Sequence, residues 1–373
     1  MTIVSDDQTL SAIGLMSGTS LDGIDVARIY TNGSDYVKQG EGMTYPYPDA
    51  VTEALLSLLE KPEQAFSLPL SELEEAVTDA QTQAVRQFLE QFHISLQDVD
   101  VVGFHGQTVL HRPEQKFTRQ LGLGQRMACD LKIPVVSQFR LADVKAGGEG
   151  APLVPVFHQA LASELEKPVV ILNLGGVGNV TYLDEGIIIA FDTGPAGALI
   201  DDYMRRHFNC SYDEGGMLAA QGKPNPALLS SFLTDSFFSR KPPKSLDRNA
   251  FHRWNSSIEA LSPEDAVATL TAYTVESVAA SCHHMPHQAK LWLVGGGGRE
   301  NSFIMERLQD RLNVPVLPVE SVGWNGDFLE AQAFGYLAVR HIRNLPLTYP
   351  GTTGVATPLC GGVMNIPLLC QET

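Results

Sequence analysis

The sequence predicts an α/β protein built from two domains. Short β-branched runs alternate along the chain with longer amphipathic stretches, which is the pattern of an α/β fold. At 373 residues the chain is longer than one hydrophobic core usually organises. Glycine and proline are concentrated at 145–155, KAGGEGAPLVP, which predicts a domain boundary there. We therefore expect a first domain of residues 1–150 plus 345–373 and a second domain of residues 151–344.

The individual elements follow from local patterns. The apolar runs expected to form strands are 101–104, 134–137, 169–174, 187–191, 291–294 and 314–318. Amphipathic stretches predict helices at 71–92, 263–281 and 328–342. Ser262 is the expected N-cap of the second helix, because Pro263 and two acidic residues follow it. The segment from Leu345 onward is rich in turn-forming residues, and we expect it to return to the first domain.

Composition argues against several classes of protein. The formal net charge is −17 and the pI is near 4.9, whereas a nucleic-acid surface needs clustered Lys and Arg. No run approaches the roughly 18 apolar residues of a membrane span, and MTIVSDDQTL does not resemble a signal peptide. The five cysteines are scattered and include no CxxC pair, as in reduced cytosolic proteins. We expect a cytoplasmic protein with neither nucleic-acid nor membrane partners.

Glycine-rich turns accompany several of the expected strands. They are GLMSGTSLDGID at 14–25, NLGGVGN at 173–179, DTGPAG at 192–197 and VGGGGREN at 294–301. Turns of this composition expose backbone N–H groups and hydroxyls that can bind phosphate oxygens. One such cluster alone is more often an ordinary tight turn, but several in one chain favour phosphate binding. None matches a P-loop or a Rossmann fingerprint, which argues against both of those nucleotide-binding classes.

The two halves of the chain contain similar stretches. IGLMSGTSLDG in the first half is similar to IIIAFDTGPAGALIDD in the second, and VDVVGFHGQT is similar to AKLWLVGGGG. Two α/β domains of the same topology would explain both similarities. Chance would also explain them, because a strand followed by glycine is common.

Polar side chains next to expected strands and helices are candidates for a site. His105 directly follows a strand, at the edge where α/β sheets bind ligands. Arg140 could bind an anionic substrate through two hydrogen bonds, and Glu330 could bind sugar hydroxyls. Each has an alternative role: His105 could be a structural histidine, Arg140 could form a surface ion pair, and Glu330 could interact with the helix dipole. For CHHMPH at 282–287 we favour the end of a helix over a zinc site.

Together, these motifs resemble the 1,6-anhydro-N-acetylmuramic acid kinases of bacterial cell-wall recycling. The stretches that carry the resemblance are GLMSGTSLDGID, GFHGQT, FRLADVKAGGEGAPLVP, NLGGVGNVT, FDTGPAGALID, VGGGGREN and GWNGDFLEAQAFGYLA. The resemblance implies two ribonuclease-H-like domains around a nucleotide cleft, as in actin, Hsp70 and the sugar kinases. It also implies an unusual reaction, in which water opens the 1,6-anhydro ring while ATP phosphorylates O6. The products would be N-acetylmuramic acid 6-phosphate and ADP, in peptidoglycan recycling.

The resemblance also assigns roles to residues. Asp192 would be the general base that activates water, and His105, Arg140 and Glu330 would surround the sugar, with Arg140 on the lactyl carboxylate. Magnesium should accompany ATP, with ligands that the sequence does not identify, and a homodimer is expected. The residues assigned to the nucleotide are Gly18, Thr19, Ser20, Leu21, Asp22, Gly23, Ile24 and Asp25 in the first phosphate loop, with Gly295, Gly296 and Gly297 in the second half.

The chain departs from the family pattern at a few positions. Family members often have Asp where this chain has Gln138, Gln at Glu149 and Pro at Gly326, and many related kinases have an acidic residue at Met16. The first two departures put substrate affinity in doubt, whereas Asp192 and its turn are intact. Two other functions stay open at this point. One is an ordinary sugar or acid kinase of the same fold, and the other is a non-catalytic sensor of ATP or sugar.

Overall fold

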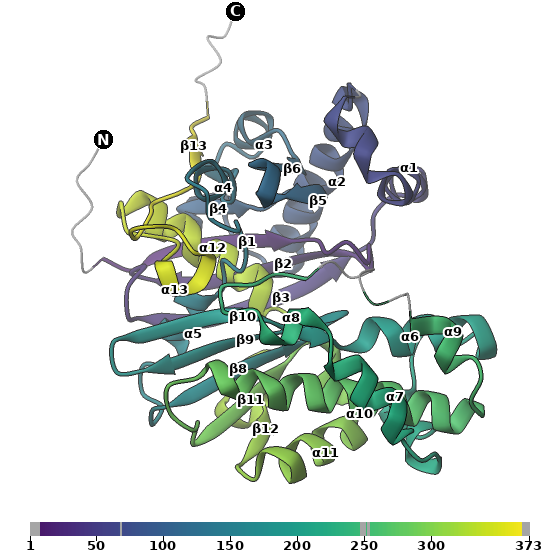
Figure 1. Ribbon diagram of the computed structural model, residues 1–373. Coiled ribbons are helices and arrows are strands. Elements are labelled where there is room, and N and C mark those ends of the chain that lie inside the picture. The colour runs from purple at the N-terminus through teal and green to yellow at the C-terminus, as the bar shows by residue number, and fades with distance from the viewer. Residues whose placement is uncertain (1–7, 68, 247–250, 252–253, 368–373) are drawn as a thin grey trace, which may run out of the picture. The chain divides into compact units, whose positions relative to one another are not determined.

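The computed structural model describes residues 8–67, 69–246, 251 and 254–367, and it divides into two compact units (Figure 1). Unit 1 comprises Met1–Ser163 and Phe328–Thr373, and unit 2 comprises Glu164–Asp327. The bounds differ from those expected at 150/151 and 344/345. The second boundary differs because the helix at Leu329–Ile342, which was expected in the second domain, packs on the sheet of unit 1.

Unit 1 contains a six-stranded sheet and a separate hairpin. Its strands are β1 (Leu10–Met16), β2 (Ile24–Thr31), β3 (Val37–Tyr45), β4 (Val101–Phe104), β5 (Gln107–Arg112), β6 (Phe117–Leu121), β7 (Val135–Ser137) and β13 (Val363–Asn365). Its helices are α1 (Asp49–Glu60), α2 (Ser71–Gln91), α3 (Gly124–Leu131), α4 (Leu141–Lys145), α5 (Pro155–Leu161), α12 (Leu329–Ile342) and α13 (Pro350–Thr353). Strand β13 pairs with β7, so the C-terminal segment returns to the first domain as expected.

Unit 2 contains a five-stranded sheet. Its strands are β8 (Val169–Leu174), β9 (Val177–Asp184), β10 (Ile187–Pro195), β11 (Leu291–Gly295) and β12 (Val316–Pro318). Its helices are α6 (Gly197–Phe208), α7 (Pro226–Leu233), α8 (Ser236–Ser239), α9 (Asn255–Ile258), α10 (Pro263–Ser281) and α11 (Ser302–Leu312). The expected strands are all present, with β4 and β8 at the predicted bounds and β10 longer than predicted.

The two sheets share one topology. Unit 1 has the strand order β13-β7-β4-β1-β2-β3 and unit 2 the order β10-β9-β8-β11-β12. In each, three successive antiparallel strands lie on one side and two parallel strands on the other; unit 1 adds β13 at its edge. This is the ribonuclease-H-like arrangement that the family resemblance implied, and it is present in both units.

The shared topology confirms one of the two sequence similarities and corrects the other. VDVVGFHGQT and AKLWLVGGGG contain β4 and β11, which occupy equivalent positions. The pairing of IGLMSGTSLDG with IIIAFDTGPAGALIDD was wrong, because β1 is a central strand whereas β10 lies at a sheet edge. The equivalent of β1 is β8, and NLGGVGN is the turn between β8 and β9. A strand followed by glycine does not distinguish these positions by itself.

Helix α12 packs unusually close to the central strands of unit 1 (Figure 1). Gly14 of β1 and Gly103 of β4 are neighbours in the sheet. A Cβ at Gly14 would overlap the carbonyl oxygen of Ala331 and the amide nitrogen of Gly335, and one at Gly103 would overlap the carbonyl of Phe334. Glycine is required here because backbone approaches backbone.

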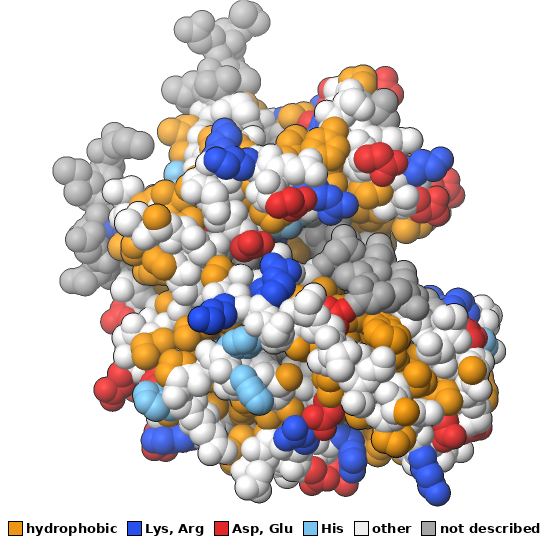
Figure 2. All heavy atoms as spheres, viewed as in Figure 1, with side chains coloured by type: hydrophobic (Ala, Val, Ile, Leu, Met, Phe, Trp, Pro, Cys, Tyr) orange, Lys and Arg blue, Asp and Glu red, His pale blue; other side chains and the backbone are white. Residues whose placement is uncertain are grey.

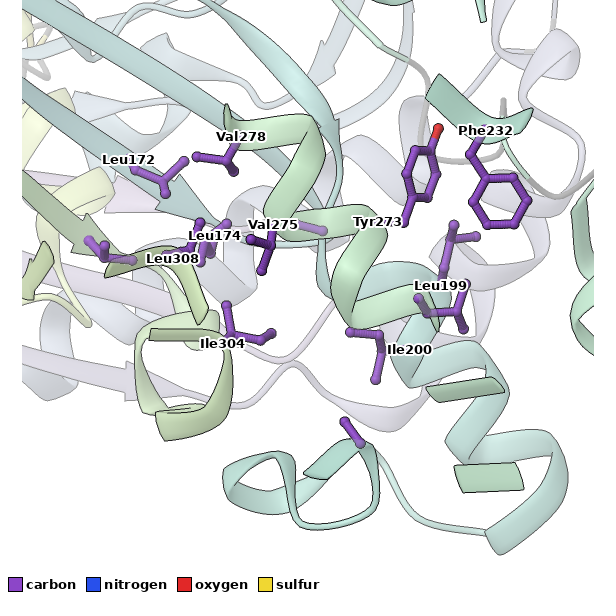
Figure 3. Close-up of a cluster of buried hydrophobic side chains, with 14 of the residues drawn as sticks. Leu172, Leu174, Leu199, Ile200, Phe232, Tyr273, Val275, Val278, Ile304 and Leu308 are labelled. Atoms are coloured by element: carbon purple, nitrogen blue, oxygen red, sulfur yellow. The ribbon is translucent and has the colours of Figure 1, made fainter. Parts of the chain in front are cut away.

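Helix α10 is the centre of the core in unit 2. Figure 3 shows Val275 and Val278 directed toward Leu172 and Leu174 of β8, while Tyr273 lies near Phe232. The helix begins as the sequence predicted, because the Ser262 hydroxyl accepts a hydrogen bond from the amide of Asp265 at 3.3 Å. Burial of aliphatic side chains on several faces of one helix stabilises each by about 1.5–3 kcal/mol.

Charged side chains of both signs are interspersed on the face shown in Figure 2. Ion pairs also form between exposed side chains, as between Arg126 and the carboxylates of Glu75 and Asp79 at 2.9 and 2.8 Å. Exposed pairs of this kind contribute about 0–1 kcal/mol each. Within the part of the chain that the structure describes, no helix is long and apolar enough to span a membrane.

The close approach of α12 predicts a strong effect of one methyl group. We expect Gly14→Ala to lower the free energy of unfolding by about 3 kcal/mol or more, because neither backbone can move away. Gly18→Ala is the matched control in the same unit, where the new Cβ would lie 3.4 Å from its nearest neighbour. Urea denaturation measures both changes, and equal midpoints for the two variants would contradict the packing argument.

Candidate active site

The loop after β1 is the candidate phosphate loop of unit 1. Thr19, Ser20 and Asp22 are exposed in it, and Leu21 has a φ of +59°, with its amide donating to the carbonyl of Gly18 at 3.3 Å. The loop therefore turns tightly and presents its small polar residues to solvent. It spans fewer residues than the sequence predicted.

The C-terminal part of the predicted phosphate loop belongs to the sheet instead. Ile24 begins β2 and is fully buried in the core, and Asp25 follows it in the strand. The Asp25 carboxylate accepts a hydrogen bond from the Thr44 hydroxyl at 2.6 Å. A side chain at Gly23 would collide with Thr44. These positions hold the end of the loop against β3.

A buried network of hydrogen-bonded polar side chains holds the backbone of the loop. Gln107 donates to the carbonyl of Gly18 at 3.2 Å, the Tyr47 hydroxyl donates to Gln107 at 3.4 Å, and Gln81 donates to that hydroxyl at 2.6 Å. Burial raises the pKa of Tyr47 to about 12, so the hydroxyl keeps its proton. Neither Tyr47, which lies just before α1, nor Gln81 of α2 was predicted as part of the site from the sequence.

The structure brings His105, Arg140 and Glu330 into one cluster in unit 1. The Arg140 Nε donates to His105 Nε2 at 3.1 Å, which makes Nδ1 the protonated nitrogen, and Nδ1 donates to the Gly106 carbonyl at 2.8 Å. Burial holds the pKa of His105 well below its usual value, and Arg140 adds to that shift. The imidazole is therefore neutral.

Burial also lowers the pKa of Arg140, to about 10, while the charges of Glu330 and Asp143 oppose the shift. The guanidinium thus stays charged at neutral pH in a poorly solvated place. Its Nη1 donates to the Gly150 carbonyl at 2.9 Å, which adds a second internal bond to the one with His105. This arrangement orients the guanidinium before any ligand arrives.

The loop that carries Gly150 is held by residues far away in sequence. Asp143 is 2% exposed and accepts hydrogen bonds from the Gly150 amide at 2.7 Å and from the Thr353 hydroxyl at 2.6 Å. The Glu149 amide donates to the Thr353 carbonyl at 2.7 Å. His111 Nε2 lies 2.8 Å from the Glu149 carbonyl. The C-terminal segment therefore holds the loop beside Arg140.

The family departures in unit 1 lie beside this cluster. Gln138 is exposed and has a φ of +55°, a conformation in which Asp is better tolerated than Gln. The position of Glu149 is set partly by its backbone, whose two hydrogen bonds any non-proline residue would make. The loop path therefore does not depend on the Glu149 side chain for these bonds.

Asp192 lies on β10 in unit 2, at a β-bulge. The strand register shifts between Asp192 and Gly194. The Leu246 amide donates to the Asp192 Oδ2 at 2.7 Å, and the Asp192 amide donates to the Lys244 carbonyl at 3.0 Å. The residue is partly exposed, and its carboxylate is oriented by the chain. Bulges re-aim side chains in this way.

The DTGPAG turn after Asp192 continues into α6. The amides of Gly197 and Ala198 donate to the carbonyls of Gly175 and Gly176 at 2.9 and 3.2 Å. The first N–H groups of this helix are thus occupied by the turn between β8 and β9 rather than directed at a ligand. NLGGVGN forms the hairpin between β8 and β9, and its Gly175 and Gly176 carbonyls cap the start of α6.

The remaining glycine-rich stretch follows β11. Gly295 is the last residue of the strand, and Gly296 has a φ of +72°. Gly298 packs on Leu174, where a Cβ would lie only 2.5 Å from the Leu174 Cβ. A Cβ at Gly297 would meet nothing within 4 Å. Of Gly295, Gly296 and Gly297, Gly297 is therefore the one with open space beside its backbone.

Arg299 fixes the segment that follows these glycines. It donates to Glu320 at 2.9 Å, to Asp327 at 2.6 Å and to the Gly296 carbonyl at 3.1 Å. The Gly326 amide donates to the same Glu320 oxygen at 3.2 Å, and a side chain there would lie 2.6 Å from the Arg299 Nε. A proline at this position, which the family resemblance leads one to expect, could not make the Glu320 bond.

The histidines of CHHMPH have separate partners. The His284 ring packs edge-on against Phe191, whereas His287 Nδ1 lies 2.8 Å from an Asp184 carboxylate oxygen. Among the described residues, no group of three or more His, Cys, Asp or Glu could hold a metal ion.

The fold and these sites define a class of protein before any comparison. The chain has two ribonuclease-H-like units, a polar turn after the first strand of unit 1, and an acidic residue on the third strand of unit 2. These features are typical of the actin, Hsp70 and sugar-kinase class. The sequence model of anhydro-N-acetylmuramic acid kinase matches residues 10–366. The chain belongs to this family.

Relatives support the assignment over nearly the full chain. The anhydro-N-acetylmuramic acid kinase of Paramagnetospirillum magneticum is 48% identical over 359 residues, which is 95% of this chain and 99% of that protein. The protein of the same name from Azorhizobium caulinodans is 48% identical over 370 residues, covering 96% and 100%. Among solved structures, component A of the Acidaminococcus fermentans (R)-2-hydroxyglutaryl-CoA dehydratase aligns with a TM-score of 0.47 at 10% identity, covering 89% and 98%.

The buried histidines predict how stability depends on pH. Burial lowers the pKa of His111 to about 4, with Arg140 acting in the same direction. Between pH 6.5 and 4 the unfolded chain therefore binds this proton and the folded chain does not, so the free energy of unfolding falls as the pH falls. We expect His111→Gln to show a smaller loss between pH 7 and pH 5 in urea denaturation. The control is His93→Asn at an exposed histidine, and equal slopes for both variants would contradict the account.

Proposed function

We propose that this protein is an ATP-dependent kinase that opens the 1,6-anhydro ring of 1,6-anhydro-N-acetylmuramic acid with water and phosphorylates O6. The products are N-acetylmuramic acid 6-phosphate and ADP. The observation that carries the proposal is Asp192, a partly exposed carboxylate oriented by a bulged strand and by the Leu246 amide, in a chain of this kinase family. Because the reaction consumes ATP, we place it in the cytoplasm.

In the proposed mechanism Asp192 is the general base. Its carboxylate takes a proton from water as the water oxygen forms a bond to C1 of the sugar. The bond between C1 and the bridging oxygen breaks, and that oxygen, which remains bonded to C6 as O6, attacks the γ-phosphorus of ATP. The bond from the γ-phosphorus to the β-bridging oxygen breaks and ADP leaves. Asp192 then returns its proton to solvent.

Unit 1 provides the groups proposed to bind the sugar. Arg140 is charged and already oriented by His105 and Gly150, which suits it to the carboxylate of the lactyl group. The exposed Glu330 can accept hydrogen bonds from sugar hydroxyls or the N-acetyl group. Neutral His105 lies beside the sugar in this proposal and holds Arg140 in place, because its two ring nitrogens are bonded to Arg140 and to the Gly106 carbonyl. Pre-orientation reduces the entropy lost when the sugar binds.

The nucleotide is proposed to bind through backbone groups. The amides of the exposed loop at 18–20 in unit 1 and the open backbone at Gly297 in unit 2 can contact phosphates or ribose without side-chain obstruction. A magnesium ion would accompany the ATP, and it would neutralise charge on the phosphoryl group that is transferred.

The role of Asp192 predicts a separation of binding from turnover. We expect Asp192→Asn to lower kcat by at least about a thousandfold, because the amide cannot accept the proton from water. The dissociation constant for ATP should change by less than about threefold, since phosphate binding is assigned to other residues. Stopped-flow turnover and calorimetric titration measure the two quantities, and a variant with near-normal kcat would remove Asp192 from this role.

Labelled water distinguishes the proposed reaction from an ordinary sugar kinase. With the wild-type enzyme in ¹⁸O-water, we expect one labelled oxygen on C1 and unlabelled oxygen in the C6 phosphoester bridge, because water attacks C1. Mass spectrometry of the product and its fragments locates the label before exchange at the anomeric carbon. The control is pre-formed N-acetylmuramic acid 6-phosphate incubated for the same time. A product with no label beyond that control would favour the ordinary kinase.

A further inference from the structure

Lys244 is a buried cation that the proposed reaction does not use. Its side chain lies in unit 2 and the residue is 4% exposed. The Nζ donates to the carbonyls of Phe237 at 3.0 Å and Phe238 at 3.5 Å, and it lies 3.4 Å from His284 Nε2. It also lies 4.5 Å from the centre of the Phe237 ring. Lysine is rarely buried unless it is well partnered, so the chain has built a specific place for this ammonium group.

The backbone beside Lys244 holds Asp192 at two points. The Lys244 carbonyl accepts a hydrogen bond from the Asp192 amide at 3.0 Å. Two residues later, the Leu246 amide donates to the Asp192 Oδ2 at 2.7 Å. We call residues 244–246 the lysine strap. Its backbone is bound to Asp192, and its first side chain is anchored against α8 and His284.

The charges around the strap are consistent with this anchoring. Burial lowers the pKa of Lys244 to about 8, Arg240 shifts it in the same direction, and Asp192 opposes both. Burial and the nearby ammonium also lower the pKa of His284, which favours the neutral imidazole. Its Nε2 lies 3.4 Å from the Lys244 Nζ and 3.4 Å from the Phe238 carbonyl. At neutral pH the arrangement is therefore a charged lysine that donates to two carbonyls and lies beside a neutral histidine.

We infer that Lys244 is a positioning residue for the Asp192 carboxylate. Its anchored ammonium fixes the strap, and the strap's Leu246 amide holds Oδ2 in one orientation, which determines the direction in which the carboxylate approaches water. This inference rests on the proposed function of Asp192. A base must lie within hydrogen-bond reach of the proton it removes, and a displacement of about 1 Å can reduce a rate by about a hundredfold.

Activity measurements test the inference on the full-length enzyme. We expect Lys244→Met, which keeps the length of the side chain, to lower kcat by about a hundredfold and to leave the KM for ATP within about twofold. Lys244→Arg should recover part of kcat, because a guanidinium can still donate to the Phe237 carbonyl. The matched control is Lys241→Met, which removes an exposed charge from the same segment and should behave as wild type.

Hydrogen exchange detects the strap without reference to turnover. In Lys244→Met, peptides that cover residues 244–246 should lose protection while peptides from β11 should not. Loss of protection together with the fall in kcat supports the inference. Unchanged protection, or lost protection with wild-type kcat, overturns it. Should the Met variant fail to fold, Lys244→Gln, which retains a donor without the charge, is expected to show the same changes at smaller size, and its failure to do so has the same meaning.

Asp192→Asn separates this inference from the proposed function. An inactive Asp192→Asn enzyme together with a fully active Lys244→Met enzyme means that the base is assigned correctly and that the positioning role is wrong. An active Asp192→Asn enzyme means that the assignment of the base has failed, and the positioning role falls with it, whatever the exchange data show.

Discussion

The close packing of α12 on β1 and β4 is the constraint on which the arrangement of unit 1 depends. Gly14, Gly103 and Gly335 let the helix backbone approach the sheet backbone, and the residues near the start of α12 meet the later part of β1. Glu330 therefore lies at the edge of the sheet where β1 and β4 end, which is also the edge of the loop at 17–23 and of His105. One packing contact brings these segments together.

The same edge receives Arg140 from a third strand. Strand β7 runs parallel to β4, so the chain that leaves it delivers Arg140 beside His105. In an α/β sheet, the carboxyl ends of parallel strands are where ligands bind. The low dielectric there has opposite consequences for the two side chains. It keeps His105 neutral. It also makes the charge of Arg140, which donates to His105 and to the Gly150 carbonyl, interact more strongly with an anion.

Local signals in the sequence were sufficient for much of the fold. The β-branched runs of β4 and β8 and the Ser262 cap of α10 were predicted with correct bounds, because each depends on neighbouring residues. The grouping of His105, Arg140 and Glu330 came from the family resemblance, and the structure places the three together.

What the sequence did not indicate depends on contacts between distant segments. The bond from Thr353 to Asp143 spans 210 residues, and that from Leu246 to Asp192 spans 54. Neither produces a periodic pattern. The equivalence of β1 with β8 likewise became visible only in the strand order. For the same reason, the sequence predicts that the helix now labelled α12 belongs to the second domain, whereas in the structure it is part of unit 1.

In the proposed reaction, the enzyme couples ring opening to phosphorylation in one step sequence on the same substrate. The most direct measurement compares ADP release with 1,6-anhydro-N-acetylmuramic acid and with N-acetylmuramic acid, together with the mass of each product. We expect ADP release with the anhydro sugar and a product whose mass is that of the substrate plus water and one phosphoryl group. ADP release with the ring-opened sugar alone would contradict a single coupled reaction.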